Sequence, residues 1–170
     1  MNVVLCGFMG CGKTTVAKLL AARLNMDCID LDQYIEHTTG MRVSEIFEKF
    51  GEPGFRSYER NAVSAVCKTN NCVIATGGGT VLDAQNAAVL RKSGVIFFLD
   101  VSVDTVLARL QNDHSRPLLE RSDKEQAIAL LLSARLPLYK AACDYSINAN
   151  GASPEMIAEN ILSIIKKLDK

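Results

Sequence analysis

Gly7-Phe8-Met9-Gly10-Cys11-Gly12-Lys13-Thr14 is the stretch that decides the fold of this 170-residue chain, because it reads G-x-x-x-x-G-K-T. An apolar run at residues 3–6 predicts a short buried strand before it, and residues 13–24 predict a helix after it. A glycine loop between a strand and a helix is the context that a phosphate-binding loop requires. Its predicted ligand residues are Gly10, Cys11, Gly12, Lys13, Thr14 and Thr15.

This loop predicts the binding of a nucleoside triphosphate with Mg²⁺. Backbone N–H groups of the loop would surround the phosphates, and the helix N-terminus would add positive potential. Lys13 would reach the β- and γ-phosphates, and the hydroxyl of Thr14 would contact the metal. The loop alone leaves open which group receives the phosphate.

The composition narrows the class of protein. Lys and Arg together number 19, and so do Asp and Glu, which gives a formal net charge of zero. A general nucleic-acid-binding face needs a basic excess, so we expect no nucleic acid as a partner. The apolar runs are too short to span a membrane, and the six cysteines form no C-x-x-C pair. We expect a single domain over residues 1–170 that is cytoplasmic, reduced and monomeric, with no membrane as a partner.

Strand-like and helical patterns alternate along the chain. The predicted strands are 3–6, 28–29, 72–75, 95–99 and 145–147. The predicted helices include 13–24, 84–91, 104–111 and 154–168, and a further helix is expected to end over residues 135–139. This alternation predicts an α/β fold in three α/β/α layers, with a central parallel sheet of about five strands. Ligands of such sheets bind at the carboxyl ends of the strands.

Two segments interrupt the alternation. Residues 32–68 form a long helical insertion that is broken at Gly40 and again at 51–54, and we interpret it as a substrate-binding subdomain. Residues 111–124 are polar and contain a proline between two helices. A long irregular segment in a compact domain is usually a lid or a binding loop, so we predict a lid there.

Two carboxylates follow the second predicted strand, at Asp30 and Asp32. One interpretation is structural: Asp32 caps a helix over residues 33–38, and Asp30 is solvated. The other is functional, because a nucleotide site needs a carboxylate that orders the metal's water shell and an acceptor site needs a hydrogen-bond acceptor. The phosphate-binding loop favours the functional interpretation.

Two further motifs point to an anionic acceptor. Arg56 and Glu59 lie three residues apart, on one face of a helix, so Glu59 could orient Arg56 to fork onto a carboxylate. The alternative is an ordinary surface ion pair.

Gly77-Gly78-Gly79 follows the third strand, and three consecutive glycines suit a place where a ligand or another backbone approaches closely. Arg109, Arg116 and Arg135 could add positive charge around a transferring phosphoryl group.

Together these motifs resemble the shikimate kinase family, within the P-loop nucleoside-monophosphate-kinase-like fold. The resemblance covers nearly the whole chain, in order and at the expected spacings. Its pieces are the loop 7–15, Asp30-Leu31-Asp32 with Ile35-Glu36, Gly51-Glu52 with Phe55-Arg56 and Glu59, Gly77-Gly78-Gly79, Arg116-Pro117-Leu118-Leu119, and Arg135 with Pro137-Leu138-Tyr139.

The resemblance implies ATP-dependent phosphorylation of the 3-hydroxyl of shikimate, with Mg²⁺, on the path to chorismate and the aromatic amino acids. Asp32 would bind the ring hydroxyls and accept the proton of the attacking one. Arg56 and Arg135 would hold the carboxylate beside the backbone of Gly77, Gly78 and Gly79. The remaining acceptor residues would be Glu59, Phe47 and Phe55.

On the nucleotide side, the resemblance implies that Asp30 orders the magnesium shell behind Thr14. Arg116 would come in with the lid and touch the phosphates, and Arg109 would lie near the base. Residues 148–154 should form the adenine loop, although they lack an arginine that some members of the family carry there.

Two other classes stay open at this point. A gluconate-type kinase of the same fold also takes an acceptor with a carboxylate and hydroxyls. A non-catalytic nucleotide-binding module or GTPase switch is disfavoured, because no N-K-x-D guanine signature occurs and Lys13, Asp32 and Arg56 are all present.

Overall fold

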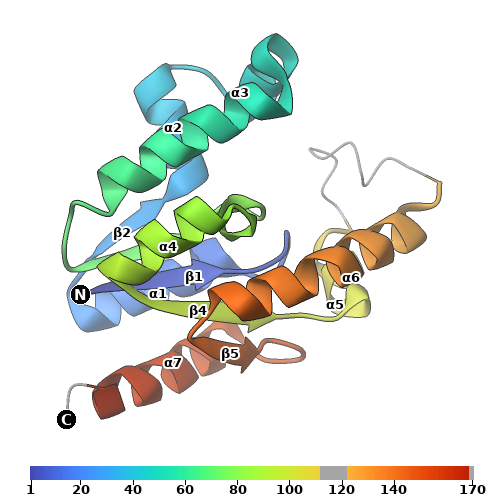
Figure 1. Cartoon of the computed structure of the whole chain (residues 1–170). Helices are drawn as coiled ribbons and strands as arrows, with labels where there is room; N and C mark the ends of the chain where they lie inside the picture. The colour runs from blue at the N-terminus through green and yellow to red at the C-terminus, as the bar shows by residue number, and fades with distance from the viewer. Residues whose placement is uncertain (112–121, 169–170) are drawn as a thin grey trace.

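The computed structural model describes residues 1–111 and 122–168, which surround a five-stranded parallel sheet (Figure 1). The strand order across the sheet is β2-β3-β1-β4-β5. The bounds are β1 Asn2–Cys6, β2 Asp27–Asp30, β3 Cys72–Ala75, β4 Gly94–Asp100 and β5 Tyr145–Asn148. Each strand overlaps one that the sequence predicts, and the predicted α/β class with a parallel sheet is confirmed.

Helices cover both faces of this sheet, so the three predicted layers are present (Figure 1). Their bounds are α1 Lys13–Leu24, α2 Leu31–Thr39, α3 Val43–Val66, α4 Ala84–Ser93, α5 Val103–Arg109, α6 Lys124–Ala142 and α7 Pro154–Leu168, with a short 3₁₀ helix, η1, at Thr80–Leu82. Helices α1 and α7 pack together on one face, while α4 and α6 lie against β4 on the other.

The core is centred on β1, which is buried along its whole length because it pairs with β3 on one side and β4 on the other. Leu5, Ile74 and Phe97, one from each of these three strands, are fully buried. Strands that helices cover on both faces need continuous apolar runs, and this is the pattern that made them visible in the sequence.

The predicted insertion corresponds to α2 and α3, which project from the sheet beside β2 (Figure 1). Both expected breaks are present. Gly40 ends α2 with a φ of 68°, and Gly51, with φ 66° and ψ −174°, kinks α3. A left-handed φ is costly for residues with a Cβ, so glycine is favoured at both positions.

One helix boundary differs from the sequence prediction. The segment Arg135–Tyr139 was expected to end its helix, but α6 continues through Pro137 to Ala142. Its last carbonyls are bound from another element, because Arg91 on α4 donates to the carbonyls of both Ala141 and Ala142 at 2.9 Å. The end of α6 is therefore set by a tertiary contact.

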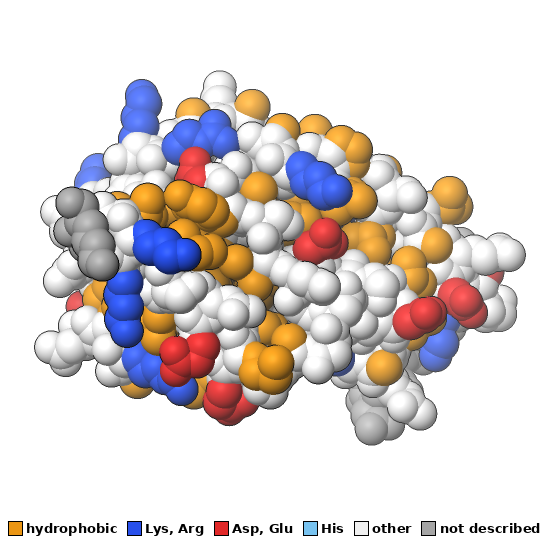
Figure 2. Space-filling model, turned by 90° about the horizontal axis from the view of Figure 1, so that it is seen from below, with side chains coloured by type: hydrophobic (Ala, Val, Ile, Leu, Met, Phe, Trp, Pro, Cys, Tyr) orange, Lys and Arg blue, Asp and Glu red, His pale blue; other side chains and the backbone are white. Residues whose placement is uncertain are grey.

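Figure 2 shows the face that is seen when the molecule of Figure 1 is viewed from below. Charged side chains of both signs are scattered over this face, with apolar side chains between them. This distribution accords with the equal numbers of acidic and basic residues. Among the described residues, none of the helices is both long and apolar enough to cross a lipid bilayer.

Candidate active site

A cavity of about 250 Å³ lies at the carboxyl ends of the central strands, where sequence reasoning expects ligands. It brings together the phosphate-binding loop, the two carboxylates and the glycine run. Its lining is Met9, Gly10, Gly12, Lys13, Thr14, Thr15, Asp30, Asp32, Thr76, Gly77, Gly78 and Leu110. Nine of the predicted site residues thus share one hollow.

The phosphate-binding loop is held open by its own lysine. Lys13 Nζ donates to the carbonyl oxygens of Gly7 at 2.8 Å and Phe8 at 3.0 Å. Gly12 has a φ of 97° and precedes the first residue of α1, and no side chain caps that helix end. The N–H groups of the first turn are therefore available to an anion. The side chain of Cys11 is fully buried, so only its backbone could contact a ligand.

Asp30 serves two neighbours at once. Its Oδ1 accepts from the backbone N–H of Asp32 at 3.1 Å and of Gln33 at 3.2 Å, which makes it the N-cap of α2. The structural alternative, with Asp32 as the cap and Asp30 solvated, is therefore wrong, because the helix begins two residues earlier, at Leu31. The other oxygen, Oδ2, accepts from Thr14 Oγ1 at 2.6 Å.

Asp32 faces the same cavity from the first turn of α2. Its Oδ1 lies so close to Gly77 that a Cβ built there would be 3.0 Å away. Thr80 Oγ1 and Glu59 Oε1 lie at 3.1 and 3.2 Å from that same point. Because Gly77 has no side chain, the oxygens of Asp32, Thr80 and Glu59 can all lie close to it.

Arg56 is held by a buried carboxylate. Its Nη1 donates to Glu59 Oε2 at 2.8 Å, and Glu59 is only 1% exposed. Thr80 Oγ1 donates to the second oxygen of Glu59 at 2.7 Å. A weaker contact joins Arg56 Nη2 to the exposed Glu52 at 3.3 Å. Burial alone would lower the pKa of Arg56, but Glu59 and then Glu52 more than offset this and raise it.

Two aromatic rings support this arginine. Phe47 stacks on Phe55 with ring centroids 4.6 Å apart, and Arg56 Cζ lies 5.4 Å from the centroid of Phe55. Phe55 is buried, whereas Phe47 is partly exposed. The predicted acceptor residues of α3 thus form one connected group.

Two further arginines, Arg135 and Arg109, lie near the phosphate-binding loop. Arg135 Cζ lies 5.8 Å from the ring centroid of Phe8 in the phosphate-binding loop. A Cβ built on Gly78 would be 3.9 Å from its Nη1. Arg109 donates to the carbonyl of Cys11 at 2.9 Å and to that of Ala149 at 3.0 Å. It therefore joins the phosphate-binding loop to the loop that was predicted to hold the base.

Comparison with known proteins shows the family of the chain. The family model described as shikimate kinase matches residues 9–166. The chain is 47% identical to a shikimate kinase of Caldicellulosiruptor saccharolyticus, over 96% of this chain and 94% of that one.

The chain belongs to the shikimate kinase family.

A second family member, from Thermodesulfovibrio yellowstonii, is 46% identical over 98% of this chain and 96% of its own length. Among solved structures, the shikimate kinase from Acinetobacter baumannii in complex with shikimate superposes with a TM-score of 0.92. Its identity is 38%, over 98% of this chain and 93% of that one. Membership in a kinase family implies the use of ATP, and it decides against the gluconate-type and non-catalytic alternatives.

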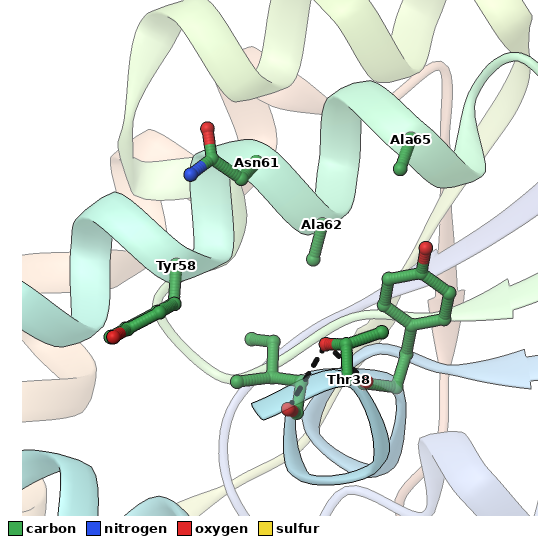
Figure 3. Close-up of a pocket in the computed structure, with 7 residues that line it drawn as sticks. Thr38, Tyr58, Asn61, Ala62 and Ala65 are labelled. Carbon is green, nitrogen blue, oxygen red and sulfur yellow. Dashed lines mark hydrogen bonds between the residues drawn. The ribbon is translucent and has the colours of Figure 1, made fainter. Parts of the chain in front are cut away.

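A second hollow, of about 200 Å³, lies between α2 and α3, and none of its lining residues was predicted to bind substrate, nucleotide or metal (Figure 3). Ala62 and Ala65 point from α3 toward α2, where the hydroxyl of Thr38 donates to the carbonyls of Tyr34 and Ile35. Its lining among the described residues carries no charged side chain. This hollow therefore lacks the cations that a phosphate or carboxylate requires.

Sequence reasoning left two side chains of the site without a role. Thr80 holds Glu59, and Tyr139 donates its hydroxyl to the carbonyl of Gly78. The available signal for Tyr139 was its spacing, because it follows Arg135 by one helical turn. Arg116 and most of the predicted lid, residues 111–124, lie outside the described residues.

Proposed function

We propose that this chain transfers a phosphoryl group from ATP to the 3-hydroxyl of shikimate, giving shikimate 3-phosphate on the path to chorismate. One observation carries the proposal: Lys13, Asp32 and Gly78 line one cavity, and Arg56 is fixed by Glu59 beside the same glycine run. The A. baumannii relative, which was solved with shikimate, supports the choice of acceptor.

The residues fit a magnesium ion at the nucleotide end of the cavity. Thr14 Oγ1 and Asp30 Oδ2 lie 2.6 Å apart, and hard oxygen donors of this kind are what Mg²⁺ prefers. Thr14 would bind the metal directly, and Asp30 would hold its water shell. A bound Mg²⁺ neutralises charge that develops on the phosphate oxygens.

Lys13 changes partners when the nucleotide binds. Its ammonium leaves the carbonyls of Gly7 and Phe8 and turns to the β- and γ-phosphates, where it stabilises developing negative charge. The first-turn N–H groups of α1, together with the N–H groups of Gly10 and Gly12, surround the phosphates.

Asp32 orients the attacking hydroxyl and accepts its proton, as a carboxylate in hydrogen-bond reach of a substrate can. Arg56 and Arg135 hold the acceptor carboxylate from two sides of the glycine run. Phe47 and Phe55 border the ring of the acceptor. The fixed arginines convert binding energy into the orientation of the reacting hydroxyl.

The remaining assignments are part of the same proposal. Arg109 lies near the base, and Arg116 closes over the phosphates with the lid at 111–124. The protein acts as a cytoplasmic monomer of one domain, with its acceptor subdomain at 32–68. Partial proteolysis tests the lid, because cleavage within 111–124 should slow only when nucleotide and shikimate are both present.

An ADP-release assay tests the function. Purified protein with ATP and Mg²⁺ is offered shikimate, gluconate and a panel of nucleoside monophosphates, and release should be fast with shikimate alone. Phosphorus–proton coupling in the NMR spectrum should place the phosphate on the 3-oxygen. Lys13→Ala serves as the inactive control. Equal turnover of gluconate, or no ADP release with shikimate, would refute the proposal.

A further inference from the structure

Tyr139 is a buried tyrosine at the junction of the two halves of the site. Its ring stacks on Phe98 of β4, with centroids 5.1 Å apart and planes 16° from parallel. Its side chain is fully buried, and its hydroxyl donates to the carbonyl oxygen of Gly78 at 2.5 Å. The ring is anchored in the core, and the hydroxyl ends at the glycine run.

The same hydroxyl lies close to Arg135, a second residue of the site. Arg135 lies one helical turn before Tyr139 on α6, and its Nη1 would be 3.9 Å from a Cβ built on Gly78, the residue that the hydroxyl contacts. The guanidinium of Arg135 also lies over the ring of Phe8. Arg135 is thus held between a ring of the phosphate-binding loop and a hydroxyl that is itself tied to Gly78.

The protonation state of this hydroxyl is fixed at ordinary pH. Burial raises the pKa of Tyr139 to about 12, against a smaller lowering effect of Arg135. Tyr139 therefore keeps its proton and donates it to the Gly78 carbonyl, while its oxygen lone pairs remain available to an N–H of Arg135. The bond to Gly78 therefore persists through the neutral pH range, with the hydroxyl oxygen turned to Arg135 as an acceptor.

We propose that Tyr139 is a positioning residue for acceptor binding, which sets the orientation of the Arg135 guanidinium relative to the backbone of Gly78. An arginine side chain has many rotamers, and its fork recognises a carboxylate well only when its plane is fixed. Phenylalanine at this position would fill the same space. It would remove the hydroxyl that lies between the Arg135 guanidinium and the carbonyl of Gly78. This inference rests on the proposed function, because the anion that Arg135 would hold is the carboxylate of shikimate.

Tyr139→Phe is the direct test, since it removes one oxygen and keeps the ring on Phe98. The KM for shikimate should rise about 10-fold, as expected for the loss of a hydrogen bond to a charged group, while the KM for ATP stays within twofold. If the role of Tyr139 were purely structural, the variant would show a higher KM for both substrates, or only a lower melting temperature.

Tyr145→Phe is the matched control. Tyr145 also stacks on a phenylalanine of β4, with its centroid 5.5 Å from that of Phe97. Its hydroxyl makes no hydrogen bond to another described residue, and Tyr145 lies on β5, outside the lining of the 250 Å³ cavity. Tyr145→Phe should leave the KM for both substrates unchanged.

A double-mutant cycle with Arg135→Met then assigns the effect to the arginine. If Tyr139 acts through Arg135, adding Tyr139→Phe to Arg135→Met should not raise the KM for shikimate further. Additive losses would overturn the inference, and so would a Tyr139→Phe enzyme with unchanged KM for shikimate. Should Tyr139→Phe melt below the assay temperature, shikimate titration of the folded protein in the cold gives the same comparison.

The two proposals fail in different ways. An unmodified protein that does not phosphorylate shikimate overturns both at once. An active unmodified protein, with Tyr139→Phe indistinguishable from Tyr145→Phe in KM for shikimate, overturns only the role of Tyr139.

Discussion

The guanidinium of Arg56 lies directly against the α-carbon of Gly79. A Cβ built on Gly79 would be 2.4 Å from Nη2 and 2.7 Å from Nη1 of that arginine. These distances are below any real Cβ contact, so a side chain on residue 79 and the observed position of Arg56 exclude one another. The guanidinium of Arg56 can therefore lie at this place only because residue 79 has no side chain.

Gly79→Ala should displace the end of Arg56 without unfolding the protein, because a guanidinium at the end of a flexible side chain can move. We expect the KM for shikimate to rise at least about 10-fold, because the guanidinium of Arg56 no longer hydrogen-bonds to the carboxylate. The KM for ATP should be unchanged. Steady-state kinetics with each substrate varied separately measures this. An unchanged KM for shikimate would contradict the assignment of Arg56.

Gly78→Ala is the matched control for folding. A Cβ on Gly78 would find nothing closer than 3.7 Å, which is ordinary contact. Neither Gly78 nor Gly79 has a positive φ, so alanine adds no backbone strain at either position. Melting temperatures of the two variants should therefore be close to one another.

Arg56→Met should destabilise the fold as well as weaken acceptor binding, because it leaves the Glu59 carboxylate buried without its cation. We expect a loss of about 3 kcal/mol in the free energy of unfolding. Adding Glu59→Gln should recover much of that loss, since it removes the uncompensated charge, but it should not restore binding of shikimate. Urea denaturation measures the first effect and substrate titration the second. If the double variant is no more stable than Arg56→Met, charge burial is not the cause.

Asp30→Asn separates the structural role of Asp30 from its proposed role at the magnesium ion. Asparagine is also a good N-cap, so the unfolding free energy should change by less than about 1 kcal/mol. The carboxylate that faces Thr14 is lost, and the Mg²⁺ concentration for half-maximal activity should rise about 10-fold. Titration of activity with Mg²⁺ at fixed ATP measures the shift. A metal dependence equal to that of the unmodified protein would remove Asp30 from the magnesium shell.

Asp83 gives the fold a pH-dependent contribution. It caps α4 through the N–H groups of Gln85 and Asn86 and pairs with Arg60 at 3.3 Å. Desolvation tends to raise the pKa of Asp83, but the backbone bond from Gln85, Arg60 and the bond from Asn86 together lower it. A lowered pKa means that the stabilisation is complete above the unfolded value of about 3.9 and is lost as pH falls through the folded value.

Asp83→Ala should therefore cost about 1 kcal/mol at pH 7. The difference from the unmodified protein should shrink as pH falls below about 4, in urea denaturation series at several pH values. Asp83→Asn, which keeps a cap but cannot titrate, is the control and should show a smaller loss at neutral pH. A loss that is independent of pH would show that the charge of Asp83 contributes nothing.

The features that the sequence predicted are those encoded locally. The strand at 72–75 and the helices at 13–24 and 154–168 have the predicted bounds, because apolar runs and helical periodicity are visible within a short window. The cavity residues from Gly10 to Thr15 follow from one motif whose spacing fixes their geometry. Asp30 and Asp32 were both found, but which of them caps α2 depends on where β2 ends.

The features that the sequence did not predict arise from contacts between distant segments. The segment 135–139 was expected to end a helix, yet α6 continues to Ala142, where Arg91 binds its last carbonyls. The contact of Arg56 with Gly79 and the bond of Tyr139 to Gly78 join residues from different elements. Local propensity carries no information about such pairs, because they depend on how the sheet and helices are arranged.

The strand order β2-β3-β1-β4-β5 has a consequence for how the protein is made. β1 carries the phosphate-binding loop at its end, yet it pairs only with Cys72–Ala75 and Gly94–Asp100, which are synthesised much later. Until both β3 and β4 have left the ribosome, the apolar strand β1 has no pairing partner and is exposed to other chains. The nucleotide loop therefore acquires its shape late in folding, and early truncation products should aggregate rather than bind nucleotide.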